Sequence, residues 1–570
     1  MIEQKIESFV RDAIERCRAE GAFGFDGDVS FEISVPREEM HGDFSTNAAL
    51  VLAGRAKKRP REVADAIAAR LSEGVPEIDR VEVAGPGFIN FFMKPLLYLE
   101  GLMDIASAGP SFGELDLGRG KKLQVEFVSA NPTGPLHIGH GRGAVYGDVL
   151  GNLFRAAGFE VTKEYYVNDA GNQIRTLGRS VWLRMKEGQG EKIEFPAECY
   201  QGGYIAEIAR EAMASHKAKL AGMSEEEAIA FLGELAGERI LGEIRKDLAE
   251  TGVVHDTYFF ESRLHTDAAV ESAIGRLVER GHVFEEGGAQ WFRSTAFGDD
   301  KDRVMRKADG SLTYFAADIA YHKNKYERGF SRVIDIWGAD HGGYVARMKA
   351  AVGALGYDPA SFDAVLIQLV NLMRGGEVVS MSTRSATYET LEDVRREVGR
   401  DACRYFFLMR SHNAQLDFDL DLAKKQSSDN PVYYIQYAHA RIASVFRKAA
   451  EAGLYPPGPE DVDLSLLDLP EEPKLARLLC ELPAVIHECT KELEPHKLAF
   501  YLLEVARVFQ AYYSRGRRDE RYRVISDDVP RCRAKLFLLK NVQIVLQNAL
   551  GILGISAPDS MEREVEDADV

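Results

Sequence analysis

The sequence lacks the features that stabilise small secreted proteins and those that mark membrane proteins. Its 6 cysteines are scattered and form no CxxC pair, which indicates neither a disulfide framework nor a zinc ribbon. No run of about eighteen apolar residues occurs, and the opening MIEQKIESFV is charged and amphipathic rather than signal-like. We therefore expect a cytoplasmic protein that has no contact with a membrane and holds no structural metal.

Positive charge is also scarce. The 71 Lys and Arg residues against 89 Asp and Glu give a formal net charge of -18. Taken alone, this balance argues against nucleic-acid binding, because neutralising phosphates needs cations. Two basic runs depart from it: Arg55, Lys57, Lys58, Arg59 and Arg61, and later Arg515, Arg517, Arg518, Arg521 and Arg523. Such a run is more often a solvated surface, but local contact with RNA stays open.

The length of 570 residues exceeds one ordinary core, so roughly two to four domains are expected. Strand and helix signals alternate from 121 to about 420, as in a parallel sheet, with later strands at 332–337 and 364–370. The predicted architecture is α/β, with a Rossmann-type core, a helical insertion, an N-terminal α+β domain and a C-terminal all-α bundle. The N-terminal domain is predicted at 1–110 and the Rossmann-type core at 119–425, with the helical insertion at about 188–302. The C-terminal bundle is predicted at 430–570.

The most informative segment runs from Glu126 to His140 and reads EFVSANPTGPLHIGH. A buried-strand pattern leads through a loop into a helix, whose N-terminal amides and dipole suit the phosphates of a nucleotide. His137 and His140 can then donate hydrogen bonds to phosphate oxygens. The alternatives are two satisfied histidines or a metal pair, although no third ligand follows at helical spacing.

With its flanking Asn-Pro-Thr-Gly, this segment resembles the HIGH signature of class I aminoacyl-tRNA synthetases, and the block through Asp148 is similar to that of arginyl-tRNA synthetases. The stretches GDFSTNAA and VEVAGPGFINFF resemble the N-terminal domain of that family, which contacts the outer corner of the tRNA. Further blocks follow in the family's order: EYYVNDAGNQI, DGSLTYFAADIAYHKNK, WGADHGGYVARMKA, NPVYYIQYAHARI and LGISAPDSM. The resemblance covers nearly the whole chain.

The resemblance implies that ATP, with Mg²⁺, activates L-arginine to arginyl-adenylate and that the arginyl group then passes to tRNA(Arg). It also implies that tRNA is required before activation is seen. Catalytic roles are predicted for His137, Gly139 and His140, and ATP contacts for Pro132, Gly134, Gly338, Asp340 and His341. Gly338 would let adenosine approach the backbone, unless it only makes a turn.

A guanidinium group needs carboxylates and a flat aromatic wall around it. Glu126 ends an apolar strand, an expensive place for an unpaired charge, and Tyr314 and Asp318 share a helical face if Tyr314 opens that helix. In the family these positions, with Asn131 and Ser129, belong to the arginine pocket. The alternative for Asp318 is a salt bridge on the helix surface.

The sequence departs from the family at the second ATP signature. Where a KMSKS-like loop is typical, the chain reads Ser380-Met381-Ser382-Thr383-Arg384, and both lysines are missing. Met381 and Ser382 occupy the positions that Met and Ser have in the KMSKS signature. We therefore predict an ATP contact for Met381 and a catalytic role for Ser382. Arg384 is the nearest replacement cation and Arg374 a more distant one. A noncatalytic tRNA-binding paralogue and a synthetase for another amino acid remain alternatives.

The C-terminal part resembles the anticodon-binding bundle of the family. An aromatic and polar cluster there is of the type that stacks unpaired bases, although about half of its aromatics would instead be core residues on an amphipathic helix. The predicted tRNA contacts are Tyr433, Gln436, Tyr437, His439, Arg441 and Met561. A monomer is expected.

Overall fold

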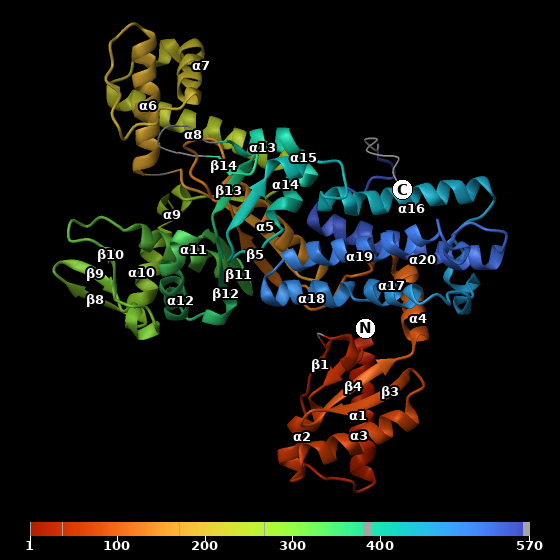
Figure 1. Ribbon diagram of the computed structural model, residues 1–570. Helices are drawn as coiled ribbons and strands as arrows, with labels where there is room; N and C mark the ends of the chain where they lie inside the picture. Colours follow the sequence, from red (N-terminus) through yellow and green to blue (C-terminus); the bar gives the residue numbers. More distant parts are fainter. Residues whose placement is uncertain (1, 37, 170, 267, 380–388, 562–570) are drawn as a thin grey trace.

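The computed structural model describes residues 2–36, 38–169, 171–266, 268–379 and 389–561. Figure 1 shows a central α/β part, with the N-terminal domain below it, a helical projection above it and a long helical bundle extending to one side. This arrangement confirms the predicted fold class.

The N-terminal domain is a four-stranded antiparallel sheet covered by helices, in the order β1-β2-β4-β3. Gly85, Pro86 and Gly87 form the turn between β3 and β4, where the Gly87 N–H donates to the Ala84 carbonyl at 3.2 Å. Its elements are α1 (Ile2–Ala19), β1 (Ile33–Ser34), β2 (Phe44–Thr46), α2 (Ala48–Ala56), α3 (Pro60–Gly74), β3 (Ile78–Ala84) and β4 (Phe88–Met93).

The central part is built on a five-stranded sheet in which all neighbours are parallel, in the order β12-β11-β5-β6-β7. Chain order reverses between β5 and β11, so the carboxyl ends of these two strands flank a crevice at the topological switch point. The strands are β5 (Lys122–Glu126), β6 (Glu160–Val167), β7 (Thr257–Phe260), β11 (Arg332–Gly338) and β12 (Phe362–Ile367).

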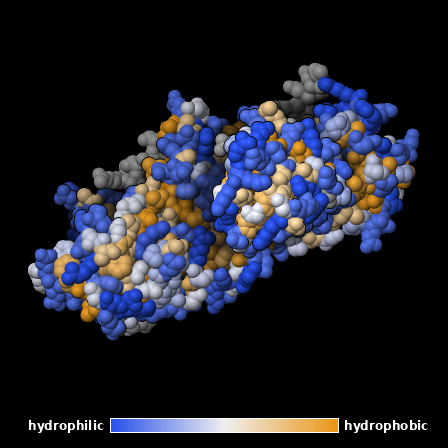
Figure 2. All heavy atoms as spheres, turned by 90° about the horizontal axis from the view of Figure 1, so that it is seen from below, coloured by the Kyte–Doolittle hydropathy of each residue, from blue (hydrophilic) through white to orange (hydrophobic). Residues whose placement is uncertain are grey.

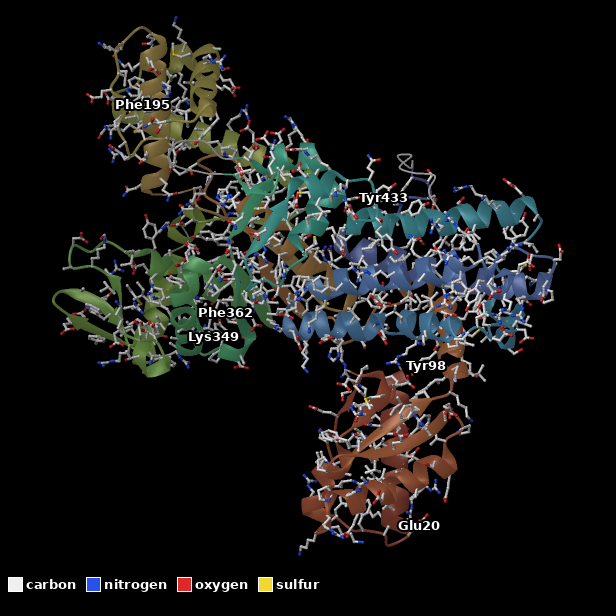
Figure 3. The ribbon with its side chains drawn as sticks, viewed as in Figure 1. Glu20, Tyr98, Phe195, Lys349, Phe362 and Tyr433 are labelled. Carbon is white, nitrogen blue, oxygen red and sulfur yellow. The ribbon has the colours of Figure 1, made fainter. Side chains whose placement is uncertain are left out.

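The predicted helical insertion at 188–302 is only partly helical. Helices α6 (Asn172–Gly188), α7 (Gly203–Leu220) and α8 (Glu225–Glu250) form the upper projection in Figure 1, where Figure 3 labels Phe195. The chain then returns to the core as β7, a short edge strand whose charged flanks hide it in the sequence. Beyond it lies a small antiparallel sheet of β8 (Val283–Glu286), β9 (Ala289–Phe292) and β10 (Arg303–Arg306).

The apolar run 364–370 was also predicted as one strand and is split in two. β12 ends at Ile367 and β13 (Val370–Arg374) starts in a different sheet, because the Gln368 N–H leaves the ladder and donates to the His412 carbonyl at 2.9 Å. The other elements here are α9 (Ser262–Thr266), α10 (Ala269–Glu279), α11 (Tyr314–Glu327), α12 (Val345–Ala354), β14 (Glu377–Val378), α13 (Leu391–Val398), α14 (Arg400–Phe407), β15 (Leu416–Asp419) and α15 (Leu420–Lys424).

Helix α5 (Ile138–Ala156) follows β5 as predicted and ends before Gly158, which has a φ of +84°. It lies very close to the sheet. A Cβ atom at Gly147 would stand 2.2 Å from the ring of Phe127, so only glycine fits at this crossing. The close approach fixes the N-terminus of α5 relative to the end of β5.

The C-terminal bundle contains α16 (Pro431–Glu451), α17 (Glu471–Cys480), α18 (Leu482–Glu492), α19 (His496–Arg515) and α20 (Val529–Leu553). Helix α20 is long and apolar enough to cross a membrane, but 72% of its apolar window is buried, as in a core helix. Figure 2 shows polar residues over most of the lower face, with hydrophobic ones in patches.

The N-terminal domain joins the bundle through α4 (Pro95–Ala108), which packs against α17. Figure 3 places Tyr98 of α4 at this junction. Nearby, the Arg477 guanidinium of α17 forms an ion pair with Asp43, whose other carboxylate oxygen accepts from the Met93 N–H at 2.7 Å. Asp43 therefore links the sheet of the small domain to the bundle.

Candidate active site

A cavity of about 710 Å³ opens at the carboxyl ends of β5 and β11, at the switch point of the sheet. It is lined by three segments that the sequence singled out: the loop after β5, the start of α5 and the segment after β11. The predicted residues in its wall are Ser129, Asn131, His137, Gly139, His140, Gly338, Asp340 and His341. The fold thus brings the two predicted nucleotide motifs to one cavity.

The two histidines cap the helix that carries them. The Gly139 N–H donates to Nδ1 of His137 at 3.1 Å, and the His137 N–H donates to Nδ1 of His140 at 3.3 Å. Because each Nδ1 accepts a hydrogen bond, each neutral ring carries its own proton on Nε2. The rings stack with centroids 3.7 Å apart. The cap therefore sets both imidazoles as Nε2–H donors.

Burial lowers the pKa of both imidazoles, that of His140 to about 3. Both rings are neutral at pH 7, and they act as hydrogen-bond donors rather than as cations. The positive field at this end of the cavity comes instead from the amides and dipole at the start of α5.

The loop after β5 turns sharply into the cavity. Val128 and Ser129 have φ values of +69° and +41°, a left-handed conformation that costs a β-branched residue on the order of 1–3 kcal/mol. Hydrogen bonds hold the turn: Ser129 Oγ donates to Glu126 Oε1 at 2.9 Å and accepts from the Tyr166 N–H at 3.1 Å. The turn directs Ser129 and Asn131 to the cavity wall.

Glu126 is buried and already has a charged partner. The Lys325 ammonium donates to Glu126 Oε2 at 2.6 Å and to Asp335 Oδ1 at 2.7 Å. Lys325 is fully buried. Burial alone would lower its pKa, but the two carboxylates outweigh burial and raise it, so Lys325 is charged at pH 7.

Asp318 lies beside this group and is paired differently. Tyr344, in the segment after β11, donates its hydroxyl to Asp318 Oδ2. Burial raises the pKa of Asp318. Tyr314 is the first residue of α11, one turn before Asp318 as predicted, and is 68% exposed. The start of α11 thus carries an exposed aromatic ring and, one turn later, a half-buried carboxylate.

Sequence reasoning missed Lys325, Asp335, His322 and Tyr344. The signals were present: His322 and Lys325 follow Asp318 by four and seven residues, at helical spacing, and Asp335 interrupts the apolar strand RVIDIW. Their partners on other elements could not be read from the chain.

Two predicted ATP contacts lie away from the cavity wall. Pro132 is buried, and Gly134 belongs to the same loop, where the Thr133 carbonyl accepts from the Tyr204 hydroxyl of α7 at 2.7 Å. They shape the loop between β5 and α5 and join it to the helical projection.

Met381, Ser382 and Arg384 lie outside the described residues. The flanks of their segment are placed beside the signature histidines: Thr390 forms a β-bridge with His137, and the Leu391 N–H donates to the Leu136 carbonyl at 2.9 Å. Arg374, the more distant replacement cation, is already engaged by Glu397 at 2.9 Å.

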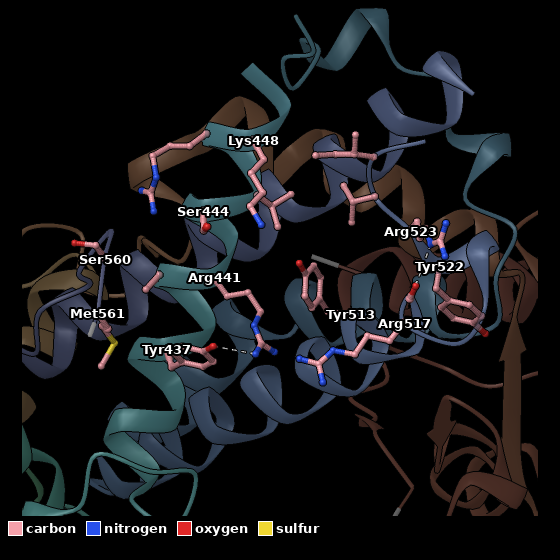
Figure 4. Close-up of a pocket in the computed structure, with 16 residues that line it drawn as sticks. Tyr437, Arg441, Ser444, Lys448, Tyr513, Arg517, Tyr522, Arg523, Ser560 and Met561 are labelled. Carbon is pink, nitrogen blue, oxygen red and sulfur yellow. Dashed lines mark hydrogen bonds between the residues drawn. The ribbon is translucent and has the colours of Figure 1, made fainter. Parts of the chain in front are cut away.

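The C-terminal bundle holds a basic cavity of about 610 Å³ (Figure 4). Arg441 stands 4.6 Å over the ring of Tyr437 and donates to its hydroxyl at 3.1 Å. Tyr433 stacks parallel to Tyr437 at 6.1 Å and lines a neighbouring cavity. Besides Tyr437 and Arg441, the wall holds Met561, Arg447, Lys448, Arg517 and Arg523. The second basic run thus contributes two of its arginines here.

Gln436 and His439 are buried instead. The Gln436 amide donates to Asp401 Oδ2 at 2.8 Å and to the Ser556 carbonyl at 3.0 Å, and Nδ1 of His439 bonds the Pro558 carbonyl at 2.9 Å. Both side chains hold the segment that ends at Met561. The first basic run is exposed on the N-terminal domain, where Arg59 pairs with Glu62 at 2.5 Å.

Buried polar contacts also join α5 to the bundle. Arg404 of α14 is fully buried, donates to Asp148 Oδ2 of α5 at 2.6 Å and donates to the Leu553 carbonyl of α20 at 2.8 Å. Asn152 of α5 donates to the Ile552 carbonyl at 2.9 Å. Helix α5 is therefore fixed to the end of α20.

Three family models match the chain. They describe an arginyl tRNA synthetase N terminal domain at residues 3–93, the catalytic domain of tRNA synthetases class I (R) at 111–408, and a DALR anticodon binding domain at 435–561. The matches follow the three structural parts of the molecule in order.

Named relatives match this chain over nearly its whole length. The chain is 49% identical over 560 residues to the Arginine–tRNA ligase of Syntrophotalea carbinolica, covering 98% of this chain and 100% of the relative. The ligase of Desulfosudis oleivorans is 48% identical over 562 residues, with coverage of 98% and 100%.

Solved structures agree with this grouping. A putative arginyl-tRNA synthetase from Campylobacter jejuni superposes with a TM-score of 0.74 at 36% identity, covering 82% of this chain and 100% of that one. The Thermus thermophilus arginyl-tRNA synthetase, at 22% identity, shares the fold with a TM-score of 0.74 over 98% of this chain and 100% of its own. The chain belongs to the arginyl-tRNA synthetase family of class I aminoacyl-tRNA synthetases.

Proposed function

We propose that this protein is an arginine–tRNA ligase, which activates L-arginine with ATP and transfers the arginyl group to tRNA(Arg). The observation that carries the proposal is the cavity at the switch point, whose wall holds two neutral imidazole donors at a helix N-terminus and Ser129, which hydrogen-bonds the buried Glu126 carboxylate. The full-length relatives named as ligases support the same activity, and nothing favours the noncatalytic alternative.

In the first step, a carboxylate oxygen of arginine attacks the α-phosphorus of ATP and the bond to pyrophosphate breaks. The protein supplies position and charge stabilisation and no nucleophile. His137 and His140 donate through Nε2–H, and the dipole at the N-terminus of α5 favours the same phosphates. Gly338, Asp340 and His341 line the adenosine side.

The amino acid lies beside the turn at Ser129. Asp318 and Glu126 face the guanidinium, Tyr314 supplies the aromatic wall, and Ser129 and Asn131 lie toward the α-amino and carboxylate end. A ligand with a planar cationic fork fits this set better than a neutral or shorter side chain. In the second step, a hydroxyl of the terminal ribose of the tRNA attacks the arginyl carbonyl and AMP leaves.

The basic cavity of the bundle is the proposed anticodon site. Tyr433 and Tyr437 offer faces on which unpaired bases stack, Arg441 adds a cation, and Met561 closes one side. Gln436 and His439 act by holding the segment that carries Met561. The exposed basic run of the N-terminal domain would meet phosphates elsewhere on the tRNA.

Magnesium would arrive with ATP, as the counter-ion of its phosphates. Among the described residues no group of three or more His, Cys, Asp or Glu side chains is placed to hold a metal by itself. We further propose a cytoplasmic monomer without membrane contact, organised in domains at 1–110, 119–425 and 430–570.

Charging of tRNA tests the function directly. We expect labelled tRNA when the purified protein is mixed with ATP, magnesium, labelled arginine and tRNA(Arg). The label should stay on the tRNA in acid and be released from it by mild base. Lysine in place of arginine should give no label. A protein that binds tRNA(Arg) but charges it with no amino acid would refute the proposal.

A further inference from the structure

We propose that Lys325 is a positioning residue that neutralises and orients Glu126, leaving Asp318 as the carboxylate whose charge meets the guanidinium. The inference rests on the proposed arginine specificity. It separates two acidic residues that the sequence treats alike, and it starts from the contacts of a lysine that no substrate can reach.

The ammonium of Lys325 is enclosed by acceptors. It lies 2.6 Å from Glu126 Oε2 and 2.7 Å from Asp335 Oδ1, and 4.4 Å from the centre of the Tyr321 ring. The Lys325 side chain has no exposed surface. Two of its N–H donors are therefore used by carboxylates inside the protein, where a substrate cannot reach them.

Asp335 has a second partner. Nε2 of His322 lies 3.0 Å from Asp335 Oδ2, and Nδ1 of His322 lies 2.8 Å from the Asp318 carbonyl. Both oxygens of Asp335 are therefore engaged inside the protein, one by the histidine ring and one by the Lys325 ammonium.

Both carboxylate oxygens of Glu126 are engaged, Oε2 by Lys325 and Oε1 by the Ser129 hydroxyl at 2.9 Å. Asp318 differs, because within the described part of the chain its side chain is held by the Tyr344 hydroxyl and forms no ion pair. Asp318 is only half-buried, so a ligand can reach this carboxylate, and a bound guanidinium supplies its counter-charge. Glu261 interacts electrostatically with Asp318 and lies 3.6 Å from His265.

Matched charge removals test this assignment. Asp318→Asn and Glu126→Gln each remove one charge at constant size, and Glu126→Gln leaves Lys325 paired with Asp335. We expect Asp318→Asn to raise the KM for arginine about 100-fold or more and Glu126→Gln to raise it less than about 10-fold. The KM for ATP should stay within about twofold in both. A Glu126→Gln defect equal to that of Asp318→Asn would overturn the proposal.

Lys325→Met in the Asp318→Asn background is the second test. Removing the lysine charge frees Glu126 to serve as the uncompensated carboxylate, so the double variant should recover at least about fivefold in KM for arginine. Lys325→Arg in the same background keeps the positive charge and should recover nothing. Additive losses with Lys325→Met in a folded protein would contradict the proposal.

If circular dichroism shows that the Lys325 variants do not fold, the comparison of Asp318→Asn with Glu126→Gln alone decides which carboxylate meets the guanidinium. The wild-type protein is measured first. A wild type that does not activate arginine refutes the proposed function, whereas an active wild type with equal defects in both single variants overturns only the role of Lys325.

Discussion

His140 has two separable tasks in this structure, and substitutions can remove them one at a time. Its Nδ1 accepts the His137 N–H as part of the helix cap, and its Nε2–H is left as a donor at the phosphate end of the cavity. Asn places an acceptor near the Nδ1 position but does not reach as far as Nε2. Gln places an amide donor near the Nε2 position.

The magnitudes of the two tasks differ. Losing the cap costs about 1 kcal/mol of stability. Losing one donor to charge that develops in the transition state costs about 10²–10³-fold in kcat. His140→Asn should therefore lower kcat for adenylate formation by about 10²-fold or more and leave the melting temperature nearly unchanged, while His140→Gln should keep a larger part of the rate.

The assay is single-turnover formation of arginyl-adenylate at saturating ATP and arginine, with tRNA present. Because burial lowers the pKa of His140 to about 3, the neutral form persists at all pH values above about 5, and no limb of the kcat profile between pH 6 and 8 should belong to this ring. A His140→Asn enzyme with a wild-type rate would show that the histidine is only a cap. A limb near pH 6.5 that this substitution abolishes would contradict the assigned neutral form.

Further outcomes follow from the contacts outside the cavity and from the altered loop. Arg404→Met should destabilise the protein by about 3–5 kcal/mol, seen as a lower urea midpoint, because the Leu553, Thr251 and Gly252 carbonyls lose their donor, while Asp148 keeps Lys163 as its ion-pair partner; unchanged urea unfolding would count against these contacts. Arg441→Ala should weaken tRNA binding by roughly 1–2 kcal/mol and reduce its salt slope by about one, without changing the KM for ATP; an unchanged slope would remove it from the tRNA surface. Arg384→Ala should lower kcat by about 10²-fold and Ser380→Lys should restore part of it; a fully active Arg384→Ala enzyme would shift the compensating role elsewhere.

Local patterns predicted much of the fold. The strand, loop and helix predicted around residues 126–140 are present as β5 and α5, and Tyr314 opens α11, so it shares a helical face with Asp318 as predicted. The parallel sheet followed from alternating signals. Such features depend on neighbours within one or two turns, and these can be read along a chain.

The parts that could not be predicted depend on distant partners. Lys325 meets Glu126 across 199 positions, and that contact decides which carboxylate carries a free charge. The left-handed turn at Val128 could not be predicted, because the sequence has no glycine there. The hydrogen bond from Ser129 to Glu126 holds this turn in the folded protein. Gln436 and Tyr437 are adjacent in the sequence, yet one is buried against Ser556 and the other faces the basic cavity.

The most direct test of the central claim is ATP–pyrophosphate exchange measured with each of the twenty amino acids, with and without tRNA(Arg). The account predicts exchange with arginine alone among them, and only when the tRNA is present. Exchange with another amino acid, or none under any condition in a protein that binds tRNA(Arg), would contradict it.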